Sequence, residues 1–136
     1  MEDMMVYTDG GSRGNPGPAA IAAIVTDCSG RLLQKHSEYI GVATNNVAEY
    51  MAVLKAMKLA LRHGNGKLVC VMDSQLVCRQ LSGQYKIKKP HLKELFEQVK
   101  EEEKKFSSVK YEHVKRENAA IQQADAMLNE TLDRRC

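Results

Sequence analysis

The sequence predicts an α/β fold in which a five-stranded mixed sheet, three antiparallel strands followed by two parallel ones, is flanked by helices. Three observations indicate this fold. Apolar runs rich in strand formers alternate with glycine-containing turns over the first 40 residues. The apolar residues then recur every three or four positions, as in a helix. Two later apolar strands are each reached through helices, so we expect them to be parallel to the first strand.

The first three strands form an antiparallel meander. Residues 4–9 make the first strand, and we expect the chain to reverse at Gly10 and Gly11 directly after it. Residues 18–27 and 31–40 flank Ser29 and Gly30, a turn signal typical of a hairpin.

A long helix follows within residues 44–66, with Asn45 or Asn46 as its cap and Gly64 past its end. Ser74 is a good capping residue and opens a short helix. The remaining elements are a strand over 67–73, the short helix over 74–83, a helix over 92–106, a strand over 109–114 and a final helix over 122–132.

Length and composition predict one domain over residues 1–136, with 43% hydrophobic and 27% charged residues. No apolar stretch approaches the roughly 18 residues of a membrane span, and the acidic start does not resemble an export signal. We therefore expect a cytoplasmic protein without membrane contact. The cysteines form no CxxC pair and are expected to be reduced thiols: Cys28, Cys70, Cys78 and Cys136.

Four carboxylates are candidates for a common site. Asp9 and Asp73 each end an apolar strand, and ligands collect at the carboxyl ends of strands in open α/β sheets. Glu49 is expected in the first turn of the long helix, and Asp125 near the start of the last helix. Either of these two alone is also explained as a charge favoured by a helix N-terminus.

Gathered together, such carboxylates would repel one another unless a cation lay among them. Oxygen ligands with few histidines favour Mg²⁺, with Mn²⁺ as a substitute, over zinc. Two such ions about 4 Å apart are the usual apparatus for displacement at a phosphodiester. The net charge of +3 only hints at a polyanionic partner, whereas residues 74–93 contain several basic residues and no acidic one.

The stretch "GGSRGNPG" at residues 10–17 is not a phosphate-binding loop of a known nucleotide class. It has no Lys-Ser or Lys-Thr after its last glycine, as a P-loop requires, and it leads into a strand rather than a helix.

Four segments taken in order, "YTDGGSRGNPGPAAIAAIV", "TNNVAEYMAVLKAMKLAL", "MDSQLVCRQLSGQYKIK" and "ADAMLN", resemble type 1 ribonuclease H across nearly the whole chain. The resemblance implies the ribonuclease H-like fold and metal-dependent cleavage of the RNA strand of an RNA/DNA hybrid, which leaves 3′-hydroxyl and 5′-phosphate ends. It also implies that Asp9, Glu49, Asp73 and Asp125 bind two metal ions, with Gly10 among the metal-binding positions.

The resemblance further implies contacts with the hybrid. Gly11, Ser12 and Gly14 fall where the family's loop touches RNA 2′-hydroxyls, and Thr44 where a DNA phosphate binds. The side chains expected to reach nucleotides are Asn15, Asn45, Asn46 and Gln75.

Two departures from the family concern the segment before Asp125. Many relatives carry a histidine in this loop, whereas "VKRENAAIQQAD" has none, and His113 lies twelve residues before Asp125, still in the predicted strand. Relatives without that histidine often show an Arg-x-x-Asn-x-x-Ala-Asp pattern, with which Arg116 and Asn118 do not align in register. Arg116 is therefore a candidate for a phosphate or loop role.

A third departure follows Gly83, where some relatives insert a basic helix that bears tryptophan. This chain has no Trp and only "QYKIKKPH" there, so it is expected to be a variant that lacks the basic protrusion. We expect Lys86, Lys88 and Lys89 to contact phosphates, with affinity that falls steeply as salt rises. The alternative is a solvated basic loop.

Two alternatives to a hybrid-cutting enzyme remain. One is a non-catalytic or accessory domain that binds RNA/DNA hybrids, and the retention of all four carboxylates argues against it. The other is a related nuclease of the same fold with another nucleic-acid substrate. The "TNN" that ends three residues before Glu49 and the "SQ" after Asp73 favour the hybrid-cutting branch. With no apolar stripe beyond the needs of the core, we expect a monomer.

Overall fold

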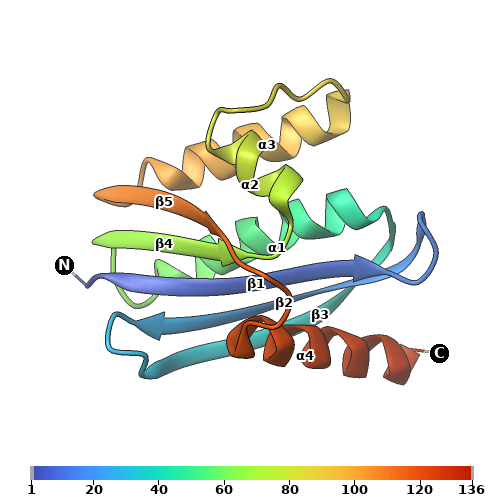
Figure 1. Ribbon diagram of the computed structural model, residues 1–136, viewed down its shortest axis with the longest axis horizontal. Helices are drawn as coiled ribbons and strands as arrows, with labels where there is room; N and C mark the ends of the chain where they lie inside the picture. The colour runs from blue at the N-terminus through green and yellow to red at the C-terminus, as the bar shows by residue number, and fades with distance from the viewer. Residues whose placement is uncertain (1, 136) are drawn as a thin grey trace.

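The computed structural model describes residues 2–135 and contains one five-stranded sheet in the order β3-β2-β1-β4-β5. The strands β1 (Met4–Ser12), β2 (Gly17–Asp27) and β3 (Leu32–Ala43) are antiparallel neighbours. Strand β4 (Lys67–Met72) runs parallel to β1, and β5 (Ser108–His113) runs parallel to β4 (Figure 1). The predicted mixed sheet, with three antiparallel strands followed by two parallel ones, is confirmed.

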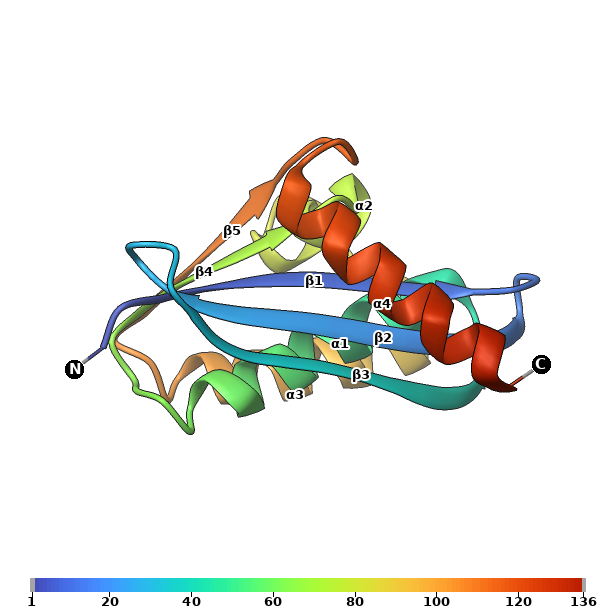
Figure 2. The ribbon, with the colours of Figure 1, turned by 90° about the horizontal axis from the view of Figure 1, so that it is seen from below.

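Helices cover both faces of the sheet. Figure 2 shows α1 (Asn45–Ala60) and α3 (Pro90–Glu103) behind the sheet and α4 (Ala119–Arg135) in front of β1, β2 and β3. The short α2 (Gln75–Leu81) follows β4 and begins at Ser74, whose hydroxyl accepts a hydrogen bond from the Val77 N–H, as predicted. None of the helices within residues 2–135 combines the length and the apolar character that crossing a membrane requires.

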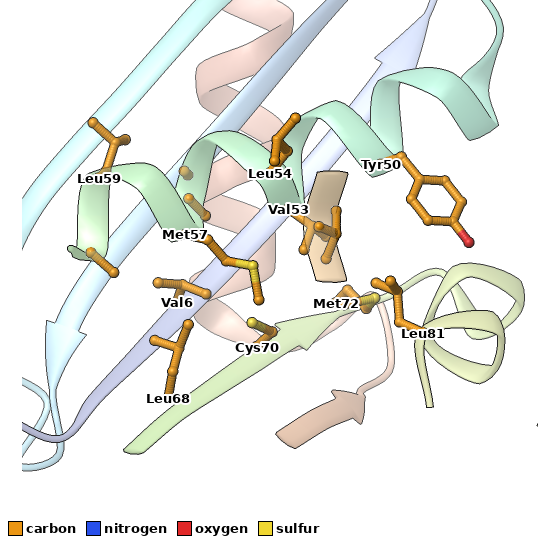
Figure 3. Close-up of a cluster of buried hydrophobic side chains, with 14 of the residues drawn as sticks. Val6, Tyr50, Val53, Leu54, Met57, Leu59, Leu68, Cys70, Met72 and Leu81 are labelled. Carbon is orange, nitrogen blue, oxygen red and sulfur yellow. The ribbon is translucent and has the colours of Figure 1, made fainter. Parts of the chain in front are cut away.

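The core is divided between the two faces. The larger cluster lies between the sheet and α1, α2 and α3, with Val6, Val53, Met57, Leu68 and Met72 near its centre (Figure 3). Its polar edge is the Tyr50 hydroxyl, which donates a hydrogen bond of 2.6 Å to Gln80 Oε1. The smaller cluster joins α4 to the other face of the sheet through Ala20, Ala22, Ile24, Ala124, Leu128 and Leu132.

The prediction that the chain reverses at Gly10 and Gly11 is wrong. Both glycines still pair with β2, opposite Ile21 and Ala20, and the reversal occurs after Ser12. Gly10 is needed for another reason: a Cβ there would lie 2.3 Å from the Ala48 carbonyl oxygen, so the close approach of β1 to α1 requires a glycine. The turn itself uses the positive φ of Gly14, +94°.

Two helix starts also differ from the prediction. Thr44, rather than Asn45 or Asn46, caps α1, because its Oγ1 accepts the Val47 N–H at 3.2 Å. Consequently Glu49 lies in the second turn of α1. Helix α4 begins at Ala119, three residues before the predicted start, which places Asp125 in its second turn. Because the dipole effect fades beyond the first turn, it does not account for either carboxylate.

Candidate active site

Asp9 and Asp73 lie side by side. Asp73 directly follows β4, as predicted, whereas Asp9 lies within β1, so the prediction that it ends its strand is wrong. The parallel register pairs Tyr7 in β1 with Val71 in β4, and each aspartate follows two residues later. Helix α1 packs against β1 and brings Glu49 to the same point. One carboxylate oxygen from each of the three residues lies within 4.8 Å of the other two. The structure therefore gathers three of the four predicted carboxylates tightly.

Burial makes this group electrostatically unfavourable without a cation. Asp9 is only 4% exposed, and burial followed by the charges of Glu49 and Asp73 raises its pKa. The pKa of Glu49 is raised as well, chiefly by burial and then by the charge of Asp73. A hydrogen bond of 2.6 Å from the Gly10 N–H to Glu49 Oε1 opposes this shift and holds the carboxylate in place.

Asp125 reaches the site from the other face of the sheet. It lines the same cleft as the other three carboxylates, and it adds to the upward shift in the pKa of Asp9. It lies outside the tight group of three. Its nearest polar neighbour along the helix is Asn129, whose Nδ2 donates to Asp125 Oδ2 at 3.3 Å and to the Asp125 carbonyl at 3.0 Å.

The cleft has a volume of about 750 Å³, and Arg13 and Arg116 line it together with the carboxylates. Arg116 Nε lies 3.4 Å from Asp73 Oδ2, and its side chain is 79% exposed. Arg116 therefore lies in the cleft beside Asp73, and its predicted phosphate or loop role stays a prediction. His113 is the last residue of β5 and is not among the residues that line the cleft.

The glycine loop, residues 10–17, closes one side of the cleft and is fastened to α1. Asn45 Oδ1 accepts hydrogen bonds from the Ser12 N–H at 2.9 Å and the Ser12 hydroxyl at 3.1 Å. In return, the Asn45 N–H donates to Asn15 Oδ1 at 2.9 Å. Both carbonyl oxygens of these side-chain amides are therefore used within the protein, and their NH₂ groups are what they can offer to a ligand.

The structure separates the other predicted contact residues into two sets. Gly11, Ser12, Asn45 and Asn46 line the cleft. Outside the lining lie Gly14, Asn15, Thr44, Gln75, Lys86, Lys88 and Lys89. The three lysines are exposed in the connection between α2 and α3, so any contact they make with a ligand extends beyond the cleft.

The sequence reasoning missed several residues of the cleft lining, among them Arg13 and Asn129. Arg13 gave no signal in the sequence, because the glycines around it were what marked the loop. Asn129 had a detectable signal, because a residue four positions after Asp125 on a helix lies on the same face.

Comparison with known proteins adds to this geometry. Residues 7–130 match the family described as reverse transcriptase-like. A ribonuclease HI of Halobacterium salinarum is 39% identical over 127 residues, which cover 93% of this chain and 63% of that protein. A bifunctional protein of Mycobacterium tuberculosis is also 39% identical, over 96% of this chain. The chain spans only about a third of that protein, 35% of its length.

Solved structures agree. The crystal structure of LC11-RNase H1 in complex with an RNA/DNA hybrid superposes with a TM-score of 0.90 at 40% identity, over 96% of this chain and 97% of that one. The RNase H1 of Halobacterium salinarum gives a TM-score of 0.91 at 36% identity, over 97% and 98%.

The sheet order and the acidic cleft beside β1 and the end of β4 define a protein of the ribonuclease H-like class. Within that class, the chain belongs to the type 1 ribonuclease H family.

Proposed function

We propose that this chain hydrolyses the RNA strand of RNA/DNA hybrids and leaves 3′-hydroxyl and 5′-phosphate ends. The observation that carries the proposal is the buried group of three carboxylates, Asp9, Glu49 and Asp73, inside a cleft that Asp125 also lines. The family supports the substrate, since a relative 40% identical has been crystallised with an RNA/DNA hybrid.

The donor set fits hard divalent cations. It consists of carboxylate oxygens, and burial and mutual repulsion raise the pKa values of Asp9 and Glu49, a cost that a cation would remove. We propose that Asp9, Glu49, Asp73 and Asp125, with Gly10 beside them, hold Mg²⁺, or Mn²⁺ as a substitute. Two such ions supply activation of the attacking water and stabilisation of the departing 3′ oxygen.

The glycine loop is proposed to recognise the RNA strand. Gly11, Ser12 and Gly14 offer backbone groups without bulky side chains, which allows close approach to the sugar. The 2′-hydroxyl is the group that distinguishes RNA from DNA, so a loop that senses it selects the strand to be cut. The amide NH₂ groups of Asn15 and Asn45 are the donors that we assign to the sugars and phosphates, since their carbonyl oxygens are already bonded.

Other contacts are proposed around this centre. Asn46 lies in the cleft, and Gln75 follows Ser74 at the start of α2, so both are assigned to nucleotides next to the reacting phosphate. Thr44 is assigned to a DNA phosphate. Arg116, held beside Asp73 and largely exposed, is assigned to a phosphate of the cleaved strand. Outside the cleft, the loop lysines Lys86, Lys88 and Lys89 are assigned to more distant phosphates.

We also propose that the protein acts as a monomer in the cytoplasm. The cysteines at positions 28, 70 and 78 are free thiols, as expected for a reducing compartment, and Cys136 lies outside the described residues.

The test is cleavage of three labelled duplexes of one sequence, RNA/DNA, RNA/RNA and DNA/DNA, with Mg²⁺ or Mn²⁺. We expect the RNA strand of the hybrid to be cut, Asp9→Asn and Asp73→Asn to abolish cutting, and the exposed control Glu97→Gln to leave it unchanged. Full activity of Asp73→Asn would contradict the metal assignment. Preferential cutting of another duplex would overturn the substrate, and a mobility shift of the hybrid without cleavage would identify a binding domain.

A further inference from the structure

Asp125 differs from the other three carboxylates in how it is held. Glu49 is fixed by the Gly10 N–H, Asp9 lies within β1, and Asp73 directly follows β4, which pairs with β1. Asp125 is carried by α4, which lies on the opposite face of the sheet from α1 and packs through the smaller of the two clusters (Figure 2). Its position in the site therefore depends on contacts that the other three do not share.

Asn129 contacts the Asp125 carboxylate from the next turn of the same helix. Its Nδ2 donates to the Asp125 carbonyl oxygen at 3.0 Å and to Asp125 Oδ2 at 3.3 Å. The same amide group is thus held by the backbone and directed at the carboxylate. Asn129 is half-buried and lines the cleft. An amide donor in this place restricts the carboxylate without adding charge.

Arg13 ties the same part of α4 to the glycine loop. Its Nη2 donates to the Asn129 carbonyl at 3.3 Å and forms an ion pair of 2.6 Å with Asp133 Oδ1. These contacts join residues more than a hundred positions apart in the sequence. The loop that is fastened to α1 through Asn45 on one side is thus fastened to α4 through Arg13 on the other.

We propose that Asn129 is a positioning residue for Asp125, and that the Arg13–Asp133 pair makes the placement of Asp125 depend on the glycine loop. This inference rests on the proposed function, in which the loop contacts RNA and Asp125 binds a metal ion. It assigns Arg13 to the organisation of the metal site rather than to the nucleic acid, although an arginine in such a loop invites the second interpretation.

The role of Asn129 is tested by metal binding without substrate. Residues that orient metal ligands change metal affinity by about 10- to 100-fold when they are replaced. We therefore expect Asn129→Ala to weaken Mn²⁺ binding to the free protein, measured by titration calorimetry, by about tenfold at one site. The control Gln123→Ala removes an exposed amide from the same helix, outside the cleft, and should bind Mn²⁺ like the wild type. Thermal unfolding with EDTA verifies that both variants are folded.

Cleavage kinetics give a second readout for Asn129. A residue that only positions Asp125 should lower kcat and leave KM for the hybrid unchanged, and raised Mn²⁺ should recover part of the loss. If Asn129→Ala binds Mn²⁺ as Gln123→Ala does, Asn129 does not position Asp125. A rise in KM alone would also overturn the proposal.

The proposed dependence of Asp125 on the glycine loop is tested by a double-mutant cycle of Arg13 and Asp133, the two partners of the ion pair. We expect Arg13→Ala and Asp133→Ala each to lower kcat by about two- to fivefold, and the kcat of the double variant to be no lower than that of either single one. If Arg13→Ala instead raises KM in a salt-dependent manner and Asp133→Ala has no effect, Arg13 binds the hybrid directly and the link is wrong.

The two proposals fail separately. A wild-type protein that binds Mn²⁺ but cuts no hybrid would contradict the proposed function, while the difference in metal affinity between Asn129→Ala and Gln123→Ala would still support the positioning role. A wild-type protein that cuts the hybrid, together with Asn129→Ala that binds Mn²⁺ normally, would overturn the positioning role alone.

Discussion

Replacing Asp9 with asparagine should stabilise the metal-free protein while it abolishes cleavage. The Asp9 carboxylate is 4% exposed and lies within 4.8 Å of carboxylate oxygens of Glu49 and Asp73. Two unit charges at that separation repel by about 3.5 kcal/mol at an effective dielectric constant of about 20. Protonation relieves most of this repulsion, since the pKa values of Asp9 and Glu49 are raised. We expect a net gain of about 1–2 kcal/mol near neutral pH, or about 3–8 °C in Tm.

The pH dependence fixes the sign of this effect. The folded protein holds a proton on Asp9 that the unfolded chain, with a pKa of 3.8, releases. The metal-free wild type should therefore lose stability as pH rises from about 4 through the raised pKa of the folded state. Asparagine does not titrate, so the advantage of Asp9→Asn should grow between about pH 5 and pH 8. Thermal unfolding followed by circular dichroism with EDTA measures both trends, and added Mg²⁺ should stabilise the wild type more than the variant.

Asp27→Asn is a matched control for which the expected change in stability has the opposite sign. The pKa of Asp27 is lowered, first by the hydrogen bond from the Ser29 hydroxyl and then by the Arg31 N–H. Asp27→Asn should therefore destabilise the protein, and the difference should disappear as pH falls through the lowered pKa. If Asp9→Asn is less stable than the wild type at every pH while Asp27→Asn behaves as expected, the buried carboxylates do not repel one another as described.

Three further predictions concern the loop, the core and the basic connection. Gly10→Ala should destabilise the protein by about 1–3 kcal/mol, because its Cβ meets the Ala48 carbonyl oxygen at 2.3 Å. Gly11→Ala, whose nearest neighbour is 3.7 Å away, should spare folding but weaken hybrid binding in a gel-shift assay on an Asp73→Asn background; equal losses would make the loop only a turn. Tyr50→Phe leaves Gln80 Oε1 unpaired and should cost about 1–3 kcal/mol in urea unfolding, and an unchanged midpoint would mean that water replaces the hydroxyl. Replacing Lys86, Lys88 and Lys89 with glutamine should change how hybrid binding depends on salt. The slope of log K for the hybrid against log salt concentration should fall by about 0.9 for each phosphate that a lysine neutralises. An unchanged slope would identify a solvated loop.

The elements of the fold were predictable because apolar periodicity records which face of each element is buried. The ends of the helices and strands were harder to predict. Gly10 and Gly11 marked a break in the strand pattern, yet both extend β1, since the glycines serve close contact with α1 rather than a turn. Thr44 caps α1 because the side chain and the N–H of Asn45 are committed to the glycine loop, a tertiary contact that local sequence does not encode.

The carboxylates of the site were identifiable because Asp9 and Asp73 each follow an apolar run, and the two runs form adjacent parallel strands. Residue type and position within an element were sufficient there. The surroundings of the site were harder to predict. Arg13 contacts α4 only because the loop and the last helix meet in space, and the basic run of residues 86–89 reveals a charge but not its distance from the cleft.

The two clusters of the core explain why the four carboxylates are not equivalent. Asp9, Glu49 and Asp73 are positioned by β1, β4 and α1, which pack in the larger cluster. Asp125 depends on the smaller cluster between α4 and the other face of the sheet, which has fewer large side chains. Polar bonds add to this packing near the carboxylate: Arg13 joins α4 to the glycine loop, and within α4 the Asn129 amide bonds the Asp125 carboxylate.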